Sequence, residues 1–144
     1  MYVKTYSIKN LPKEVYNWCC RHNYGVDGYM REFLVHAIRF GRQGKEKLKD
    51  LKIYIAHKNG RRMGWSIAYR DYYMYSGKKM YQSYVLPTFR RKGVGTRLLK
   101  KATEDFGILG VYVHDESSDF FSSNGLTESG KISGKKISKK KAKV

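Results

Sequence analysis

The chain has little cysteine, little proline and no long apolar segment, and these shortages exclude some classes of protein. Its 144 residues include two cysteines and two prolines. Cys19 and Cys20 are neighbours without a CxxC partner, and the four histidines show no close ligand spacing, so we expect neither a disulfide framework nor a structural metal site. No apolar run approaches the ~20 residues of a membrane span, and the first residues lack the apolar core of a secretion signal. We therefore expect a soluble, cytoplasmic protein.

Acidic residues are scarce as well, since twelve Asp and Glu stand against thirty Lys and Arg, a net charge of +18. The segment 131–144 holds seven of the lysines and no acid, and it is too polar to supply a packed core. We expect it to form a Lys-rich, flexible C-terminal tail after one domain over residues 1–130. So large an excess of positive charge makes nucleic acid or another anionic macromolecule a candidate partner.

Hydrophobic periodicity predicts an alternation of strands and helices. We expect strands over residues 1–8, 51–57, 63–69, 81–86, 108–113 and 126–127, and helices over 12–23, 27–41, 94–106 and 117–124. Asp27 is the expected cap of the second helix, and Gly41 and Gly107 are expected to end the second and third. Asn59 and Gly60 predict a tight antiparallel hairpin because both tolerate positive φ.

The most informative stretch runs from Tyr84 to Lys101. A β-rich run stops at Pro87, and a helical period begins at Val94. Between them lie Arg90, Arg91, Lys92, Gly93 and, in the first helical turn, Gly95. A helix start offers backbone N–H groups without partners, glycines allow close approach, and the cations add positive charge. The stretch therefore predicts an anion site, phosphate being the favoured anion, with an ordinary strand-to-helix turn as the alternative.

The order V-x-P-x-F-R-x-K-G-V-G over residues 85–95 resembles the acyl-CoA pyrophosphate loop of the Gcn5-related N-acetyltransferases, the GNAT superfamily. That family's signature is Arg or Gln, two free positions, Gly, one free position, and Gly or Ala. Arg90, Gly93 and Gly95 fill it here. A P-loop is not matched because no Gly-Lys-Ser/Thr ends the loop, and a dinucleotide-binding motif would need a third glycine.

The expected element order, β-α-α-β-β-β-α-β-α-β, also resembles the GNAT fold. The resemblance implies an α/β (α+β) domain with a mixed, mostly antiparallel central sheet and helices on both faces. It implies acetyl-CoA as cofactor, with its pantetheine arm between the strands over residues 81–86 and 108–113, which separate in relatives. The cofactor-binding residues would be Val85, Leu86, Arg90, Arg91, Lys92, Gly93, Val94, Gly95, Thr96 and Phe121.

The resemblance leaves the proton-transfer groups open. Relatives often carry N-x-x-A-x-x-F-Y-x-x-x-G-F after the last central strand, and its Tyr protonates the leaving thiolate. In this chain His114 takes the Asn position and Phe121 the Tyr position. Because Phe cannot donate a proton, either Tyr112, Tyr84 or Ser122 substitutes, or the thiolate leaves without help, or the chain is not an acetyltransferase. The candidate bases are His114, Asp115, Glu116, Asp71 and His57.

Two functions follow. The first is N-acetyltransfer from acetyl-CoA to a primary amine on an anionic or nucleic-acid-associated acceptor, because a cationic cleft disfavours free cationic amines. The cations expected to flank the cleft are Arg70, Lys78, Lys79, Arg90 and Arg91. The alternative is a GNAT-fold nucleic-acid-binding or DNA-base-modifying protein, resembling the phage Mom enzymes, with weak or no acetyl transfer. The six tyrosines between Tyr69 and Tyr84 either stack on bases or are half-buried strand residues.

Overall fold

The computed structural model describes residues 1–23, 30–42, 50–71, 78–107, 109–111, 120, 123–124 and 131–132. The strands are β1 (Tyr2–Ser7), β2 (Lys52–Lys58), β3 (Arg61–Asp71), β4 (Lys78–Val85), β5 (Leu109–Val111) and β6 (Lys131–Ile132). The helices are α1 (Lys13–Arg21), α2 (Met30–Arg42), the short 3₁₀ helix η3 (Pro87–Phe89) and α3 (Val94–Phe106).

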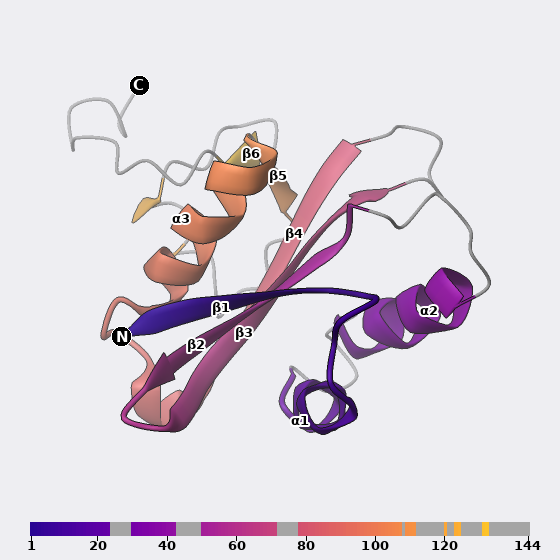
Figure 1. The fold of residues 1–144 in the computed structure, drawn as a ribbon. Coiled ribbons are helices and arrows are strands. Elements are labelled where there is room, and N and C mark those ends of the chain that lie inside the picture. Colours follow the sequence, from indigo (N-terminus) through magenta and orange to yellow (C-terminus); the bar gives the residue numbers. More distant parts are fainter. Residues whose placement is uncertain are drawn as a thin grey trace.

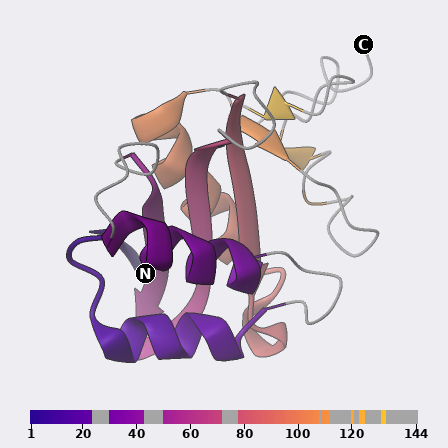
Figure 2. The same ribbon diagram turned by 90° about the vertical axis from the view of Figure 1, so that its right-hand side faces the viewer.

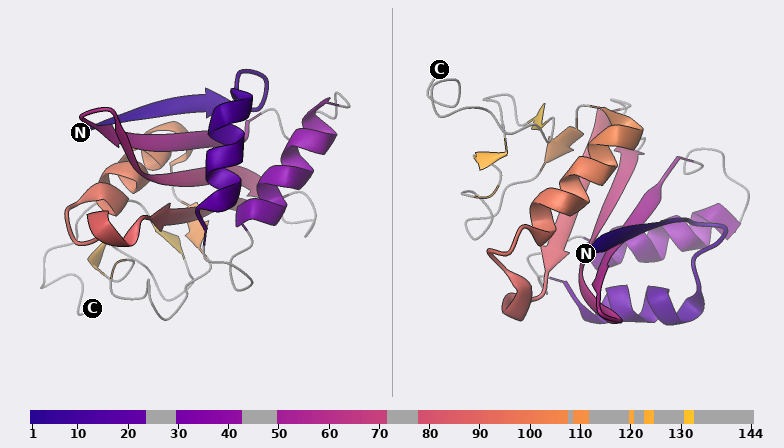
Figure 3. Two further views of the ribbon diagram at one scale, coloured as in Figure 1. Left: turned by 90° about the horizontal axis from the view of Figure 1, so that it is seen from below. Right: turned by 60° about the vertical axis from the view of Figure 1, so that its left-hand side comes forward.

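The strands form one sheet in the order of the sequence, β1-β2-β3-β4-β5-β6. All neighbours are antiparallel except β4 and β5, which are parallel. Helices α1 and α2 lie over one face of this sheet and α3 over the other, as Figure 2 and the right-hand view of Figure 3 show. The expected mostly antiparallel sheet with helices on both faces is therefore confirmed.

Strand β2 shows why helices are needed on both faces. Its side chains alternate, with Ile53 and Ile55 in the core beneath α1 and α2, and Tyr54 and Ala56 in the core beneath α3. All of them are fully buried. A strand that is apolar on both sides must be covered on both sides, and the two cores hold the sheet between them.

The hairpin between β2 and β3 has the predicted geometry. Asn59 and Gly60 both have positive φ, at 52° and 75°. Two successive residues with positive φ match the right-handed twist of the flanking strands. The turn and a β-bulge at Ala56/His57 together set the register of β3, the strand with which β4 pairs.

Of the two helix ends predicted from glycines, one is confirmed and one is wrong. α3 ends before Gly107, which has a φ of 78°, as predicted. α2, in contrast, continues through Gly41 to Arg42, so the expectation that Gly41 ends it is wrong. Glycine costs a helix only about 1 kcal/mol, which the packing of α2 can exceed. The expected cap, Asp27, lies outside the described residues. No helix of the described ranges is long and apolar enough to cross a membrane.

The C-terminal part of the sheet also differs. The structure has a strand at Lys131–Ile132, antiparallel to β5, within the segment expected to be a tail. Pairing at a sheet edge uses backbone groups alone, so a polar sequence can form it without an apolar pattern. The strand expected at 126–127 lies outside the described residues, as do most of the helix expected at 117–124 and all of 133–144.

Two fully buried tyrosines face α3 but differ in hydrogen bonding. The Tyr54 hydroxyl donates to Oδ2 of Asp105 on α3 at 2.8 Å. The Tyr81 hydroxyl has no hydrogen-bond partner in the described part, although Ser66 and Ser83 lie near it. Burial raises the pKa of both phenols well above the ordinary value. Tyr54 therefore anchors α3 to the sheet, while the buried Tyr81 hydroxyl has no compensating bond.

Replacing these two hydroxyls one at a time tests the anchor. Tyr54→Phe should lower the free energy of unfolding by about 1 kcal/mol because it removes a made hydrogen bond. Tyr81→Phe should leave stability unchanged or raise it, because the lost hydroxyl has no bond to lose. Urea denaturation of the two variants measures both values, and equal losses would contradict the assignment.

Candidate functional site

Strand β4 extends beyond its described pairing with β5. The parallel pairing covers Met80 with Gly110 and Tyr81 with Val111, yet β4 continues to Val85. Beyond Tyr81 the described residues pair β4 only with β3, through Gly64 to Ile67. Residues 112–119 lie outside the described part of the chain. The GNAT resemblance predicts that the two strands separate at the last four residues of β4, and we call the β5 side of these residues, at the end where η3 and α3 follow, the gap (Figure 1).

Backbone geometry decides which groups face this gap. The Leu86 N–H donates to the Met63 carbonyl at 3.0 Å, so the even-numbered residues of β4 bond to β3. The odd-numbered residues then point their N–H and C=O groups the other way, and β5 meets them at Tyr81. The backbone groups of Ser83 and the Val85 N–H therefore face the gap, while the Val85 carbonyl accepts a hydrogen bond from Arg90 Nε. A ligand lying there would meet a row of N–H and C=O groups like that of a missing strand.

The turn from β4 into α3 is built around left-handed residues. Arg91 has a φ of 61° and Gly93 a φ of 81°, and α3 begins at the next residue. The first helical hydrogen bond runs from the Arg97 N–H to the Gly93 carbonyl at 3.1 Å. The N–H groups of 94–96 therefore have no acceptor within the helix. They point outward at the helix N-terminus, where the macrodipole favours an anion.

The charges around this turn are the reverse of those on the other helices. α1 has Glu14 and α2 has Glu32 in the first turn, whereas α3 has no acid there. Its start is preceded by three exposed cations, Arg90, Arg91 and Lys92. Cations at this position oppose the helix dipole by about 0.3–1 kcal/mol each, and a bound anion would offset that cost. The turn thus has the chemistry of an anion site.

The two glycines of the motif have different roles. Gly93 has open space where a Cβ would be, together with its left-handed φ. A Cβ on Gly95 would lie 3.0 Å from Cε2 of Phe120, closer than carbon atoms pack. We expected both glycines to admit a ligand. In the structure Gly95 contacts Phe120, where a side chain would not fit, and only Gly93 lies where the loop is open.

Arg90, expected beside the phosphates, contacts the end of β4. Its Nε donates to the Val85 carbonyl at 2.9 Å, and its guanidinium lies 5.5 Å from the centre of the Tyr84 ring. Tyr84 and Leu86 are partly buried against the α1–α2 core, and Val85 against the α3 core. Arg90 therefore holds the last residues of β4 in place, a contact that the motif did not predict.

Of the candidate acids and bases, Tyr84 lies on β4 next to Val85, and its side chain packs against the α1–α2 core. His57 is stacked on Tyr2 at 5.1 Å and lies on β2, which β3 separates from β4. Burial, followed by the charges of Arg62 and Lys4, lowers its pKa. Asp71 is in register with Lys78, at the far end of β4 from the gap. The other candidates lie outside the described residues: Tyr112, His114, Asp115, Glu116, Phe121 and Ser122.

Two of the cations expected to flank the cleft are already engaged. Arg70 forms an ion pair with Asp50 at 2.7 Å, and the Lys79 ammonium donates to the Phe106 carbonyl at 2.7 Å. The positive charge near the loop therefore comes from 90–92. The sequence reasoning missed Ser83, whose backbone lies on the gap side of β4, and Gln82, whose buried amide donates to the Tyr69 hydroxyl at 3.1 Å. The signal for both was an amide and a hydroxyl inside a β-rich run just before the loop.

Comparison with known families decides the class of this site. A family model described as an acetyltransferase (GNAT) domain matches residues 49–128, which include β2 to β5 and the glycine loop. This chain belongs to the GNAT acetyltransferase family. Members of the family are acyltransferases and generally use acetyl-CoA, so the chain is an acyltransferase. No curated protein matches it significantly by sequence.

Solved structures agree in fold. A putative acetyltransferase from Exiguobacterium sp. 255-15 has 21% identity and a TM-score of 0.56, over 92% of this chain and 91% of that one. An aminoglycoside acetyltransferase from an uncultured soil metagenomic sample, solved with sisomicin, has 16% identity and a TM-score of 0.47, over 83% and 81%. Ribosomal-protein-alanine N-acetyltransferase from Brucella melitensis has 16% identity and a TM-score of 0.48, over 77% and 73%. The first shows that this chain has the GNAT fold, and the other two are too distant to add to that.

A pair of glycine variants tests the loop. Gly93→Ala should weaken acetyl-CoA binding at least tenfold, because it adds a Cβ to the open face and strains a left-handed residue by about 1–2 kcal/mol. Gly107→Ala is the matched control, since Gly107 also has positive φ and open space but lies at the other end of α3. Titration calorimetry with acetyl-CoA measures both affinities, and thermal melting measures the strain. Equal loss of affinity in the two variants would show that strain alone is responsible.

Proposed function

We propose that this protein transfers an acetyl group from acetyl-CoA to a primary amine carried on an anionic or nucleic-acid-associated acceptor. The observation that carries the proposal is that two sets of backbone groups lie at one end of the sheet. One set is the N–H groups of 91–96 at the start of α3, and the other is the backbone of Ser83 and the Val85 N–H on the β5 side of β4. Together they match a ligand with a pyrophosphate at one end and an amide-bearing arm at the other.

The residues of the loop fit this cofactor. The N–H groups of 91–96 would hold the pyrophosphate, with added charge from Arg91 and Lys92, and the open space at Gly93 leaves room for it. The pantetheine amides would pair with the backbone of Ser83, as a neighbouring strand does. When bound, acetyl-CoA supplies an acetyl group activated as a thioester.

The chain would then contribute charge stabilisation and proton transfer. The Val85 N–H, on the β5 side of β4, would donate to the thioester oxygen as negative charge develops on it. Tyr84 adjoins Val85 and is our candidate donor of the proton to the leaving thiolate, with Tyr112, the residue after β5 in the sequence, as the alternative. His114 is the candidate that takes the proton from the attacking amine, directly or through water.

The preference for an anionic acceptor rests on charge. Arg91 and Lys92 are exposed beside the gap, and the chain carries +18. A free polyamine is repelled by such a surface, whereas an amine on an anionic body is attracted to it, with association about ten- to a thousandfold faster at low salt. The alternative, a nucleic-acid-binding or base-modifying protein without efficient acetyl transfer, is favoured by Phe121 at the position of the usual acid.

Incubation with radiolabelled acetyl-CoA and separated pools of nucleic acid, protein and small amines tests the proposal. We expect label in an anionic or nucleic-acid-bound acceptor, declining as salt is raised, and little in free polyamines. Efficient labelling of polyamines would refute the anionic acceptor. Acetyl-CoA binding without transfer to any pool would favour the alternative, and an absence of acetyl-CoA binding at millimolar concentration would refute both the cofactor and the transferase.

A further inference from the structure

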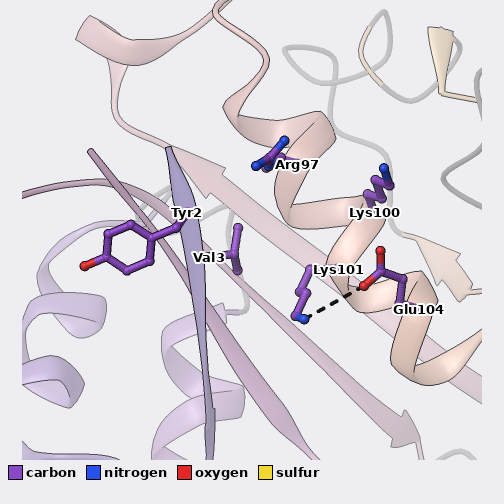
Figure 4. A pocket seen from close by; sticks show the side chains of 6 residues that line it. All are labelled: Tyr2, Val3, Arg97, Lys100, Lys101 and Glu104. Carbon is purple, nitrogen blue, oxygen red and sulfur yellow. Dashed lines mark ion pairs between the residues drawn. The ribbon is translucent and has the colours of Figure 1, made fainter. Parts of the chain in front are cut away.

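A groove lies between the edge strand β1 and helix α3, outside the site described above. It has a volume of about 330 Å³ and is lined by Tyr2, Val3, Arg97, Lys100, Lys101 and Glu104. Figure 4 shows the α3 side chains along one wall and β1 as the other. The polar face of α3 thus forms one side of a concave surface.

The groove is separate from the cofactor loop. The contact of α3 with Phe120 is made at Gly95. At 100° per residue, Arg97 and Lys101 project about 200° and 240° around the helix from Gly95. The free N–H groups of 94–96, in turn, point along the axis at the helix end. A ligand in the groove would therefore touch neither the pyrophosphate site nor the gap beside β4.

The groove is cationic, and its cations are accessible. Arg97 Nη2 donates to the Met1 carbonyl at 3.2 Å, which leaves other guanidinium donors available. Lys101 lies 3.8 Å from Glu104, a surface pair of small energetic value. Lys100 is exposed and has no ion pair within the described part of the chain. Three cations against one acid favour an anionic occupant.

The large apolar side chains that are exposed in the described part lie beside this groove. Met1 is 39% and Tyr2 58% exposed, and both are at the start of β1. The Tyr2 ring is stacked on His57, with 5.1 Å between centroids and 10° between planes, so its other face is presented rigidly. Figure 4 shows this ring on the opposite side of β1 from Arg97 and Lys101. An aromatic platform beside a row of cations is the combination that binds unpaired nucleotides.

We infer that the β1–α3 groove binds single-stranded nucleic acid, with phosphates at Arg97, Lys100 and Lys101 and a base on Tyr2. A single strand is favoured over a duplex because stacking on Tyr2 requires an unpaired base. The same helix leads to Arg91 and Lys92, so a bound strand can continue toward the loop. The inference deepens the proposed function by naming the anionic body that carries the acceptor, and it rests on that function only for the transfer step.

Two triple variants with the same net charge test the groove. The groove variant is Arg97→Gln, Lys100→Gln, Lys101→Gln. The control is Lys13→Gln, Arg31→Gln, Arg39→Gln, which removes three exposed cations from α1 and α2 on the other face of the sheet. Fluorescence anisotropy with a labelled single strand of about 12 nucleotides measures affinity over a range of salt, and thermal melting checks that both variants fold.

We expect the groove variant to bind the strand at least about tenfold more weakly at 0.1 M salt, and its log–log salt slope to be less steep by about 2. The control should lose less than about threefold. Tyr2→Ala should weaken binding about fivefold or more, and Tyr2→Phe should retain it, because stacking needs the ring and not the hydroxyl. Equal losses in the two triple variants would show that net charge alone accounts for the effect, and the inference would be wrong. Equal binding of duplex and single strand would also contradict the inference.

Titration of the same samples with acetyl-CoA separates this inference from the proposed function. The groove variant should bind acetyl-CoA as the unmodified protein does. If it loses both ligands, the groove is part of the cofactor site and the inference is wrong. If no sample binds acetyl-CoA while the groove variant alone loses affinity for the oligonucleotide, the proposed function is wrong and nucleic-acid binding in the groove is supported.

Discussion

The candidate site depends on the last four residues of β4. The described parallel pairing with β5 ends at Tyr81, and β4 then continues to Val85 with its other edge paired to β3. Backbone groups within a domain need hydrogen-bond partners, so the β5 side of these residues is a position for a ligand if the strands separate there as the family resemblance predicts. Because α3 begins only a few residues further on, the N–H groups of its first turn lie close in sequence to this end of β4. The end of β4 and the start of α3 thus supply two kinds of backbone donor.

The surrounding contacts keep this arrangement in place. Tyr54 ties α3 to β2 through Asp105, and Phe120 packs against Gly95. Arg90 closes the end of β4 by bonding the Val85 carbonyl. The loop itself includes the strain of a left-handed Arg91 and a row of cations at a helix N-terminus. The contacts around the loop stabilise the fold, whereas the loop itself costs free energy. Such local costs are usual at functional sites.

Much of the fold could be predicted from the sequence because its signals are local. Asn59-Gly60 specifies a hairpin, and the spacing of Val94, Leu98, Ala102 and Phe106 specifies α3, with all four side chains buried as expected. The GNAT family could be predicted because the loop motif is contiguous. What could not be predicted depends on contacts between distant residues. The place of β6, the bond from Arg90 to β4, the contact of Gly95 with Phe120 and the groove between β1 and α3 all bring together segments far apart in sequence.

The central claim is that the N–H groups of 91–96 hold the pyrophosphate while the edge of β4 holds the arm of acetyl-CoA. Amide chemical shifts of the ¹⁵N-labelled protein, followed during titration with acetyl-CoA, test it most directly. We expect the largest chemical-shift changes at the amides of 91–96 and of Ser83 and Val85, with small changes at Arg97 to Glu104 along the groove. Saturable binding that leaves the loop amides unmoved, or changes confined to the groove, would contradict it.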